Sequence, residues 1–251
     1  MFSRIVQFKI YGKIDEKLYK LISQFRTQKV YKSIKDTKFI KPKLVTLHVH
    51  GEGSFVQSKN IATAIRNYAK YYKVPLYTFG EDFVLNSSVY LMTVGDKNFA
   101  SEYSVIGDFG YVQRRLGYKQ LIENLGMQYH KIIIIREHKF IHSGEKKVKL
   151  SPYDDLKEED VKWIEGQLKH RESRLKEEIM QNRNQKVDQE MWNQTLLTGQ
   201  QALKYGLVDG LGVFDDIREQ EYKGMKSYDI LSNLLDYYVP ANATFSSYLS
   251  I

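Results

Sequence analysis

Cysteine is absent from the 251 residues of the chain. The protein therefore forms no disulfide, and it has neither a thiolate nucleophile nor a cysteine-ligated metal site. Because secreted domains of this size often carry disulfides, we expect an intracellular or organellar protein. Proline is scarce, with four residues, and no apolar run approaches the roughly 18 residues of a membrane-spanning helix. The composition is that of a folded chain, long enough for one large α/β domain or two small ones.

Positive charge is in excess, because 38 lysines and arginines oppose 30 acids and give a net charge of +8. This excess predicts a basic surface, and contact with an acidic protein, nucleic acid or an anionic membrane is the sharper alternative. Tyrosine is abundant, with 19 residues, but Tyr68 and Tyr72 follow apolar periodicity and are expected to pack internally. No RNA-binding signature is present, so direct contact with nucleic acid is not expected.

The N-terminal region, residues 1–43, is predicted to be a basic extension with a strand near 5–10 and a helix over 15–25. No acid precedes Asp15, and basic residues alternate with apolar ones, a pattern similar to a mitochondrial targeting segment. The pattern favours a mitochondrial location, peripheral to the inner membrane if the protein meets a membrane. A soluble intracellular location elsewhere is the alternative.

A strand, a glycine turn and a helix follow in order. Alternating apolar residues predict a strand over 44–50, and helical spacing predicts a helix over 57–72 that ends before Pro75. The next strand is expected from Leu76 to Phe79. Such a βαβ unit implies parallel strand pairing and therefore an α/β fold.

The central stretch of the chain, residues 74–111, is predicted to form a strand, a tight turn, a short helix, a second strand and a glycine-flanked turn. Leu85-Asn86-Ser87-Ser88 lies where the first strand gives way to the helix. A strand-to-helix turn of this kind is where an α/β hydrolase-like chain places a nucleophile.

The second half of the chain alternates helical and apolar segments. We expect a helix over 113–125 with its leucines inside, a buried strand over 132–135, and a basic loop over 136–149. A long helix is expected from about 151 to 184, with five apolar residues buried (Val161, Ile164, Leu168, Leu175 and Ile179). A short helix over 200–205 is expected to precede a strand at 207–208 and turns at Gly210 and Gly212. Residues 218–251 are expected to form a tail with one helix over 230–237.

Two weak signals lie on the strand over 44–50 and the turn after it. His48 and His50 share one strand face, a spacing that can bind a metal, but no third ligand is evident, so a plain strand face is expected and no metal. The turn from Gly51 to Gly53 offers backbone N–H groups that can hold an anion or oxyanion.

Five motifs, in order along residues 44–217, resemble those of the signal peptide peptidase A (protease IV) family. They are TGQQALKYGLVDGLG at 198–212, GEGS at 51–54, the segment from Pro75 through Tyr90 and Asp96 to Ala100, the glycines Gly107 and Gly110, and the loop from Ser143-Gly144 through Lys147 to Ser151-Pro152. The resemblance implies a ClpP/crotonase-like fold of repeated ββα units over residues 44–217, often assembled into oligomers.

Members of this family are serine peptidases with a Ser/Lys dyad, which needs a hydroxyl nucleophile, a neutral lysine and backbone N–H donors for the oxyanion. By resemblance, the general base falls on Lys147, or on Lys146 if the register slips. The oxyanion donor falls on Gly53, and the nucleophile position falls on Asn86. No cofactor is implied.

Three positions depart from the family pattern. Asn86 carries an amide, which cannot attack a carbonyl as an alkoxide does, and Ser87 and Ser88 point elsewhere after a shift of one or two residues. Glu52 places a carboxylate beside the oxyanion turn. Asp108 stands where the family has a serine near the lysine, and an ion pair with Lys147 would keep that lysine charged and unable to act as a base.

The sequence therefore predicts a peptidase-like pseudoenzyme that acts as a scaffold or interaction subunit of a larger assembly. We expect its partners to be other protein subunits, in a mitochondrial membrane complex such as the respiratory chain or ATP synthase, or in the mitochondrial ribosome, with homo-oligomers a further alternative. Two other functions stay open: an active serine endopeptidase that uses Ser87 or Ser88 with Lys147, and a ligand-binding crotonase-like module.

Overall fold

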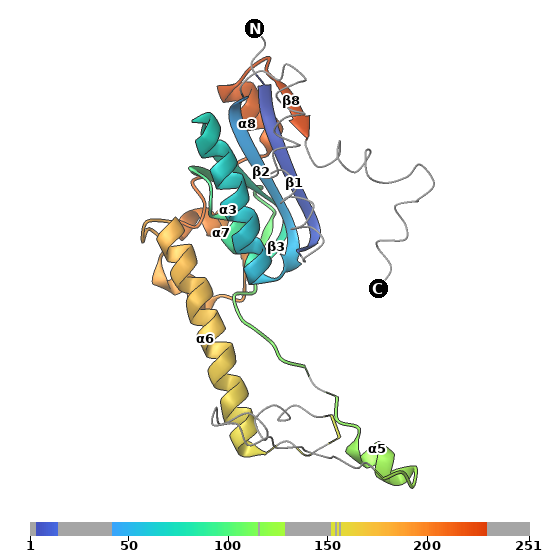
Figure 1. The fold of residues 1–251 in the computed structure, drawn as a ribbon. Coiled ribbons are helices and arrows are strands. Elements are labelled where there is room, and N and C mark those ends of the chain that lie inside the picture. Colours follow the sequence, from blue (N-terminus) through green and yellow to red (C-terminus); the bar gives the residue numbers. More distant parts are fainter. Residues whose placement is uncertain are drawn as a thin grey trace, which may run out of the picture. The chain divides into compact units, whose positions relative to one another are not determined.

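The computed structural model describes residues 4–14, 42–114, 116–128, 152–153, 155 and 157–229 (Figure 1). The chain divides into two compact units. The first unit consists of Met1–Phe109 and Leu175–Ile251, and the second consists of Gly110–Arg174.

The first unit is built on one sheet, which has eight strands in the described residues. Its main path runs β6-β5-β3-β2-β1-β8; off this path, β4 pairs with β3, and β7 pairs with β4. All pairs are parallel except β5 with β6, so the fold class is α/β as predicted. The strands are β1 (Arg4–Ile14), β2 (Pro42–Gly53), β3 (Leu76–Leu85), β4 (Lys97–Ala100), β5 (Val105–Gly107), β6 (Leu196–Thr198), β7 (Gly210–Leu211) and β8 (Lys226–Asp229).

The strand β3 pairs with two strands, β4 and β5, along the same edge. Tyr77–Gly80 pairs with β4, and Phe83–Leu85 pairs with β5. Asp82 lies between these segments with a positive φ of 29°. This split places the carboxyl end of β3 between the carboxyl ends of β2 and β5.

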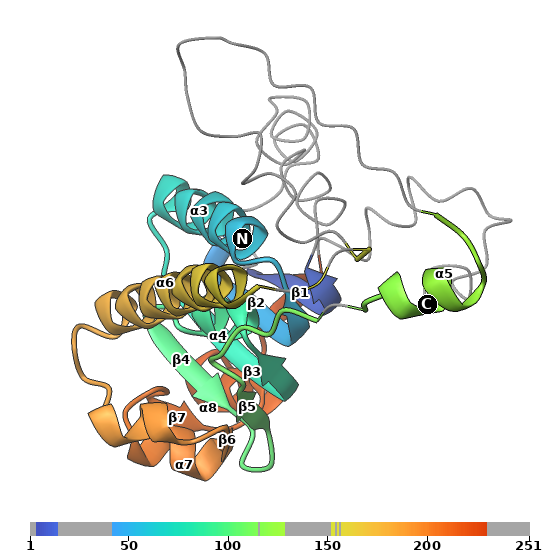
Figure 2. The ribbon, with the colours of Figure 1, turned by 90° about the horizontal axis from the view of Figure 1, so that it is seen from below.

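Helices cover the two faces of the sheet (Figure 2). On one face lie α3 (Phe55–Tyr72) and α4 (Ser87–Met92), and the ring of Tyr68 meets Phe8 of β1 at 5.6 Å. On the other face α8 (Phe214–Glu221) inserts Phe214 against Phe79 at 5.7 Å. Alternating residues along β1 and β2 point to opposite faces of the sheet, which is why the sequence pattern was sufficient to predict these two strands.

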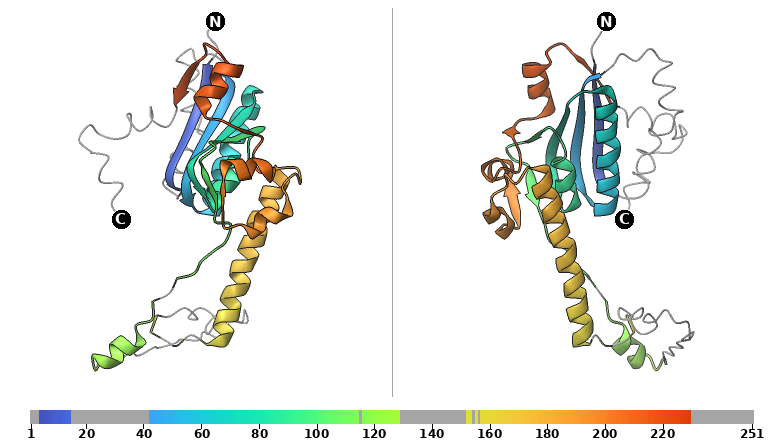
Figure 3. Two further views of the ribbon diagram at one scale, coloured as in Figure 1. Left: turned by 180° about the vertical axis from the view of Figure 1, so that it is seen from behind. Right: turned by 60° about the vertical axis from the view of Figure 1, so that its left-hand side comes forward.

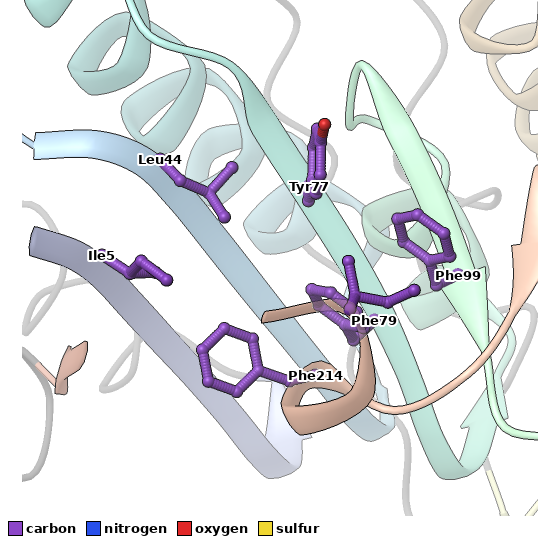
Figure 4. Packing of buried hydrophobic residues seen from close by; sticks show 7 residues of the cluster. Ile5, Leu44, Tyr77, Phe79, Phe99 and Phe214 are labelled. Atoms are coloured by element: carbon purple, nitrogen blue, oxygen red, sulfur yellow. The ribbon is translucent and has the colours of Figure 1, made fainter. Parts of the chain in front are cut away.

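The core beneath α8 is rich in aromatic rings (Figure 4). Phe79 stacks on Phe99 at 5.3 Å, and Tyr77 meets the same ring at 5.8 Å. The cluster consists of Ile5, Leu44, Tyr77, Phe79, Phe99, Phe214 and Ile217. Its members come from four strands and one helix, so this cluster holds α8 on the sheet.

The strands expected at 5–10, 44–50 and 76–79 and the helix expected over 57–72 are confirmed, and each is longer than expected. The strand expected at 5–10 is β1, which pairs with β2 and therefore belongs to the same sheet as the peptidase-like segment. The part expected as a C-terminal tail contributes β8, which pairs with β1. The expected helices over 15–25 and 230–237, the strand over 132–135 and the loop over 136–149 lie outside the described residues.

Two expectations for the second unit need correction. The helix expected over 113–125 is only α5 (Lys119–Asn124), and it buries none of its residues. Leu116, Leu121 and Leu125, expected inside, are exposed by 71%, 54% and 64%. Among the described residues, none buries a residue of this helix. Helical spacing therefore predicted a helix in this segment but gave neither its length nor its exposure.

The long helix is α6 (Glu158–Asn182). It buries Leu175 and Ile179. Val161, Ile164 and Leu168, which lie nearer its start and were also expected inside, are only partly buried.

The strand expected at 207–208 was wrong. The N–H groups of Leu207 and Val208 donate to the carbonyl of Ala202 and so close the end of α7 (Gly199–Lys204), and the strand is β7.

Candidate functional site

Four of the predicted site residues, Gly53, Asn86, Ser87 and Asp108, lie at the carboxyl ends of β2, β3 and β5. The N–H of Asn86 donates to the carbonyl of Gly107 at 2.9 Å, and the hydroxyl of Ser87 donates to the carbonyl of Gly53 at 2.7 Å. The N–H of Asp108 donates to the carbonyl of Thr195 at 2.8 Å. The strand ends of a parallel sheet are where α/β proteins place their sites.

Asn86 has a backbone conformation that most side chains avoid. It lies between β3 and α4 with φ 54° and ψ −121°, and Ser87 is the first helical residue. Such sparsely populated conformations cost about 1–3 kcal/mol and concentrate at functional sites. A sharp strand-to-helix turn is also how hydrolases of other folds present a nucleophile. The geometry of a nucleophile turn is therefore present, with an amide in its central position.

Ser87 and Ser88 are both completely buried, with 0% of either residue exposed. Ser87 holds the end of β2 through its bond to Gly53. The hydroxyl of Ser88 has no hydrogen-bond partner within the described part of the chain. All six residues of α4 are buried, so these hydroxyls face the interior rather than an open groove.

The predicted oxyanion turn is shaped by close backbone contact. A Cβ at Gly53 would lie 2.3 Å from the carbonyl oxygen of Ile14, and one at Gly51 would lie 2.0 Å from that of Gly12. Neither position can carry a side chain without moving β1. Glu52, between them, is exposed. The glycines are thus required by the pairing of β1 with β2, whatever else the turn does.

The predicted general base Lys147, its neighbour Lys146 and their loop lie outside the described residues. Asp108 is exposed at the end of β5 and has a φ of 51°. Its ion pair with Lys147 stays a prediction. So does the geometry of the dyad.

The two histidines lie on the α8 face of the sheet. His48 is 2% exposed, and its Nδ1 lies 2.6 Å from Oε1 of Glu81, while its Nε2 lies 3.3 Å from the Thr46 hydroxyl. Tyr11 donates to the other oxygen of Glu81 at 2.8 Å. Within the described ranges, no group of three or more histidine, aspartate or glutamate residues has the arrangement of a metal site.

Glu81 was missed by the sequence analysis, because it is 33 residues away from His48 in the chain. Burial raises the pKa of this carboxyl, but hydrogen bonds from His48 and Tyr11 outweigh burial and leave its pKa below the ordinary value. The ionised carboxylate therefore links β1, β2 and β3. The imidazole of His48 is buried, and a buried polar side chain needs a hydrogen-bond partner, which Glu81 supplies.

Four residues of the motif over 198–212 have a clear structural role. Thr198 and Gln201 form a reciprocal capping box at the start of α7. A Cβ on Gly199 would lie 1.9 Å from the carbonyl oxygen of Ser101. Gly206 has a φ of 76°, and a Cβ there would lie 2.5 Å from the carbonyl oxygen of Lys186. These requirements lock α7 against the turn after β4 and the segment after α6.

Asp209 is the centre of a charged network at the same place. The two terminal nitrogens of the Arg183 guanidinium donate to it, at 2.7 and 2.8 Å, and so does the backbone N–H of Asn98 at 2.8 Å. Burial raises the pKa of Asp209, but these donors outweigh burial and hold its pKa below the ordinary range. Arg183 is only 6% exposed, so the pair is a bidentate ion pair at the edge of the core.

The parallel sheet, the split strand β3 and the strained turn before α4 define an α/β protein whose candidate site lies at the strand ends. Residues 69–227 match the family model described as peptidase family S49. That match covers more than half of the chain, and the chain belongs to peptidase family S49, the family that includes signal peptide peptidase A. The resemblance found in the motifs is therefore confirmed at the level of the family.

Curated relatives match the chain over part of their own length. The "Putative signal peptide peptidase SppA" of Enterococcus faecium is 26% identical over 220 residues, 87% of this chain and 60% of that protein. The "Putative protease slr0021" of Synechocystis is 26% identical over 76% of this chain and 65% of its own. A "Na(+)/H(+) antiporter NhaA" of Brucella melitensis is 25% identical over 162 residues. The chain spans about a fifth of that antiporter and under two thirds of the other two relatives.

Proposed function

We propose that this chain is a non-catalytic, peptidase-like subunit that acts as a scaffold or interaction module in a larger protein assembly. The observation that carries the proposal is Asn86 in the strained turn between β3 and α4. The family chemistry needs a hydroxyl there, and the amide of asparagine is not a nucleophile. Loss of the nucleophile alone removes most of the rate of a dyad enzyme.

The burial of the neighbouring serines supports the same proposal. An active peptidase that used Ser87 or Ser88 needs a hydroxyl at the surface of a groove, within about 3.2 Å of its base. The Ser87 hydroxyl instead donates a hydrogen bond to the carbonyl of Gly53, and both serines are completely buried. Either hydroxyl would reach a substrate only if α4 moved out of the core.

Apolar residues that the chain leaves exposed support a role in an assembly. In the second unit Val112, Leu116, Leu121, Leu125 and Met127 are each more than half exposed. Several exposed apolar residues within one segment are consistent with contact with another protein or with a membrane. Within the described residues, the structure has no helix that combines the length and the apolar character needed to cross a membrane.

We further propose that the assembly is mitochondrial, with a respiratory-chain complex, ATP synthase or the mitochondrial ribosome as the first candidates. The basic, acid-free start of the chain and the net charge of +8 support this location. The location and the partners belong to the proposal.

A fluorophosphonate probe tests the catalytic half of the proposal. The purified full chain is expected to stay unlabelled, at the same level as Ser87→Ala and Ser88→Ala variants, while an unrelated serine hydrolase in the same tube is labelled. Labelling of the wild-type chain that disappears in either variant would support the active endopeptidase instead.

Affinity purification of the tagged chain from its native source, followed by mass spectrometry, tests the assembly half. We expect a fixed set of other subunits at constant stoichiometry, in a mitochondrial fraction. Recovery of the chain only as a free homo-oligomer would contradict the scaffold role, and recovery from another compartment would contradict the location.

A further inference from the structure

A groove of about 510 Å³ lies in the first unit between the end of α6 and the 3₁₀ helix η3 (Gln189–Asn193). Figure 3 shows the end of α6 leading into the segment that carries η3. This volume is within the usual range for a ligand site. Its lining contains neither Asn86 nor Ser87 nor Ser88.

The floor of the groove is apolar and firmly held. Met180 and Trp192 line it, and the indole of Trp192 packs edge-on against Phe109 at 5.1 Å. Lys176 lies above the same indole, with its ammonium 5.4 Å from the ring centre. Met191, the residue before the tryptophan, is completely buried and anchors η3. Trp192 is therefore fixed in place before any ligand arrives.

The walls are lined by carboxamides, with Gln181 and Gln185 on one side and Gln189 and Asn193 on the other. Among the described residues, none of these four amides makes a hydrogen bond within the protein. Other amides nearby are engaged: Asn182 contacts Thr93 and Arg66. Each free carboxamide offers two donors and one acceptor.

The backbone at Gln185 is held in a conformation that favours glycine. Asn184 and Gln185 have φ of 49° and 60°, and their N–H groups donate to the carbonyls of Gln181 and Met180. Helices commonly end in this way with a glycine, because it has no Cβ to strain. The chain instead carries a long amide side chain at this point, and that side chain lines the groove.

We infer that this groove binds an extended peptide segment of a partner protein, with one aromatic or aliphatic side chain on Met180 and Trp192. An extended peptide backbone presents alternating N–H and C=O groups, which amides on two facing walls can pair with. Lys176 and Glu177 contribute one charge of each sign, so the groove favours an uncharged segment over an acidic or basic one. The inference holds whether or not Asn86 has abolished catalysis.

Trp192 provides a direct signal, because the chain has only two tryptophans. In a Trp163→Phe background, random 12-residue peptides displayed on phage are selected on the purified full chain, and the enriched peptides are synthesised. We expect them to be uncharged at the centre, to carry an aromatic or aliphatic residue, and to shift the emission of Trp192 on binding.

Gln185→Gly is the decisive variant, because it removes one amide while relaxing the turn, so the fold is kept. We expect it to weaken peptide binding by about three- to tenfold, the effect of one lost hydrogen bond. Asn184→Gly, which relaxes the same turn without touching the groove, is the matched control and is expected to bind as the wild type does.

Three outcomes would overturn the inference. They are the absence of enriched peptides, enriched peptides that bind Gln185→Gly as tightly as the wild type, and a change of Trp192 emission with a glycan panel but not with peptides. None of them bears on the fluorophosphonate result, so the groove and the loss of catalysis fail separately.

Discussion

Asn86 keeps a strained backbone at a position where its side chain supplies no nucleophile. Its φ of 54° with ψ of −121° is a conformation that glycine adopts without strain. We expect Asn86→Gly to be at least as stable as the wild type, and Asn86→Ala to be less stable than the glycine variant by about 1–3 kcal/mol. Chemical denaturation of the three proteins measures this. Equal stability of the glycine and alanine variants would show that the turn is relaxed.

Asp209 gives the fold a dependence on pH. Its pKa is lower in the folded chain than in the unfolded chain, so the stability that it contributes is fully present above the unfolded value of about 4. That contribution is lost as pH falls through the lower folded-state pKa. Asp209→Asn leaves the Arg183 guanidinium without its ionic partner, and we expect a loss of about 2–3 kcal/mol at pH 7.

The measurement is urea denaturation of wild type and Asp209→Asn between pH 3 and pH 7. The difference between the two proteins should shrink toward low pH. Asp215→Asn is the control, because Asp215 pairs with Arg218 at 3.1 Å but is 72% exposed, and we expect a change of under about 0.5 kcal/mol. A difference for Asp209→Asn that stays constant across this range would contradict the assignment.

At the scale of elements, Gly199 decides how α7 packs on the turn after β4. An added methyl group would overlap the carbonyl of Ser101, so α7 must shift. We expect Gly199→Ala to cost about 3 kcal/mol or to prevent folding. Gly166→Ala is the matched control. That glycine lies inside α6 with open space around it, and alanine there should stabilise by up to about 1 kcal/mol. Thermal melts of both variants separate close packing from a general effect of alanine.

The elements that the sequence predicted well are those with a local signal. Alternation along β1 and β2 and helical spacing along α3 follow from neighbours a few residues apart. The position of Asn86 before α4 was also predictable, because a strand, a turn and a short helix follow each other directly.

The elements that the sequence missed depend on distant partners. Leu207 and Val208 read as a strand, but their N–H groups are captured by the end of α7. His48 and Glu81 lie on β2 and β3, which are separated in the sequence by α3. The four carboxamides of the groove come from α6, from η3 and from the segment between them, and they share no sequence motif. Nothing in local spacing shows such pairs.

For the whole molecule, the exposed leucines of the second unit lead to a test of assembly. Because α5 buries none of its residues, Leu121→Glu should change the free energy of unfolding by under about 0.5 kcal/mol. We expect the same change to reduce recovery of the chain with its assembly severalfold. Val56→Glu on α3, which replaces an apolar residue that is 64% exposed, is the control and should leave recovery unchanged. Equal recovery of both variants would exclude α5 as a contact.

The pairing of β8 with β1 affects how the protein is made. Arg4–Gln7 pairs with Lys226–Asp229, so strands from opposite ends of the described chain are neighbours in the sheet. During synthesis, β1 leaves the ribosome long before β8 exists, and the edge of β1 that pairs with β8 stays without this partner until residues 226–229 have been made. An unpaired edge is a site for wrong pairing with other chains. Chains that stall before Lys226 should therefore be the ones that chaperones and proteases remove.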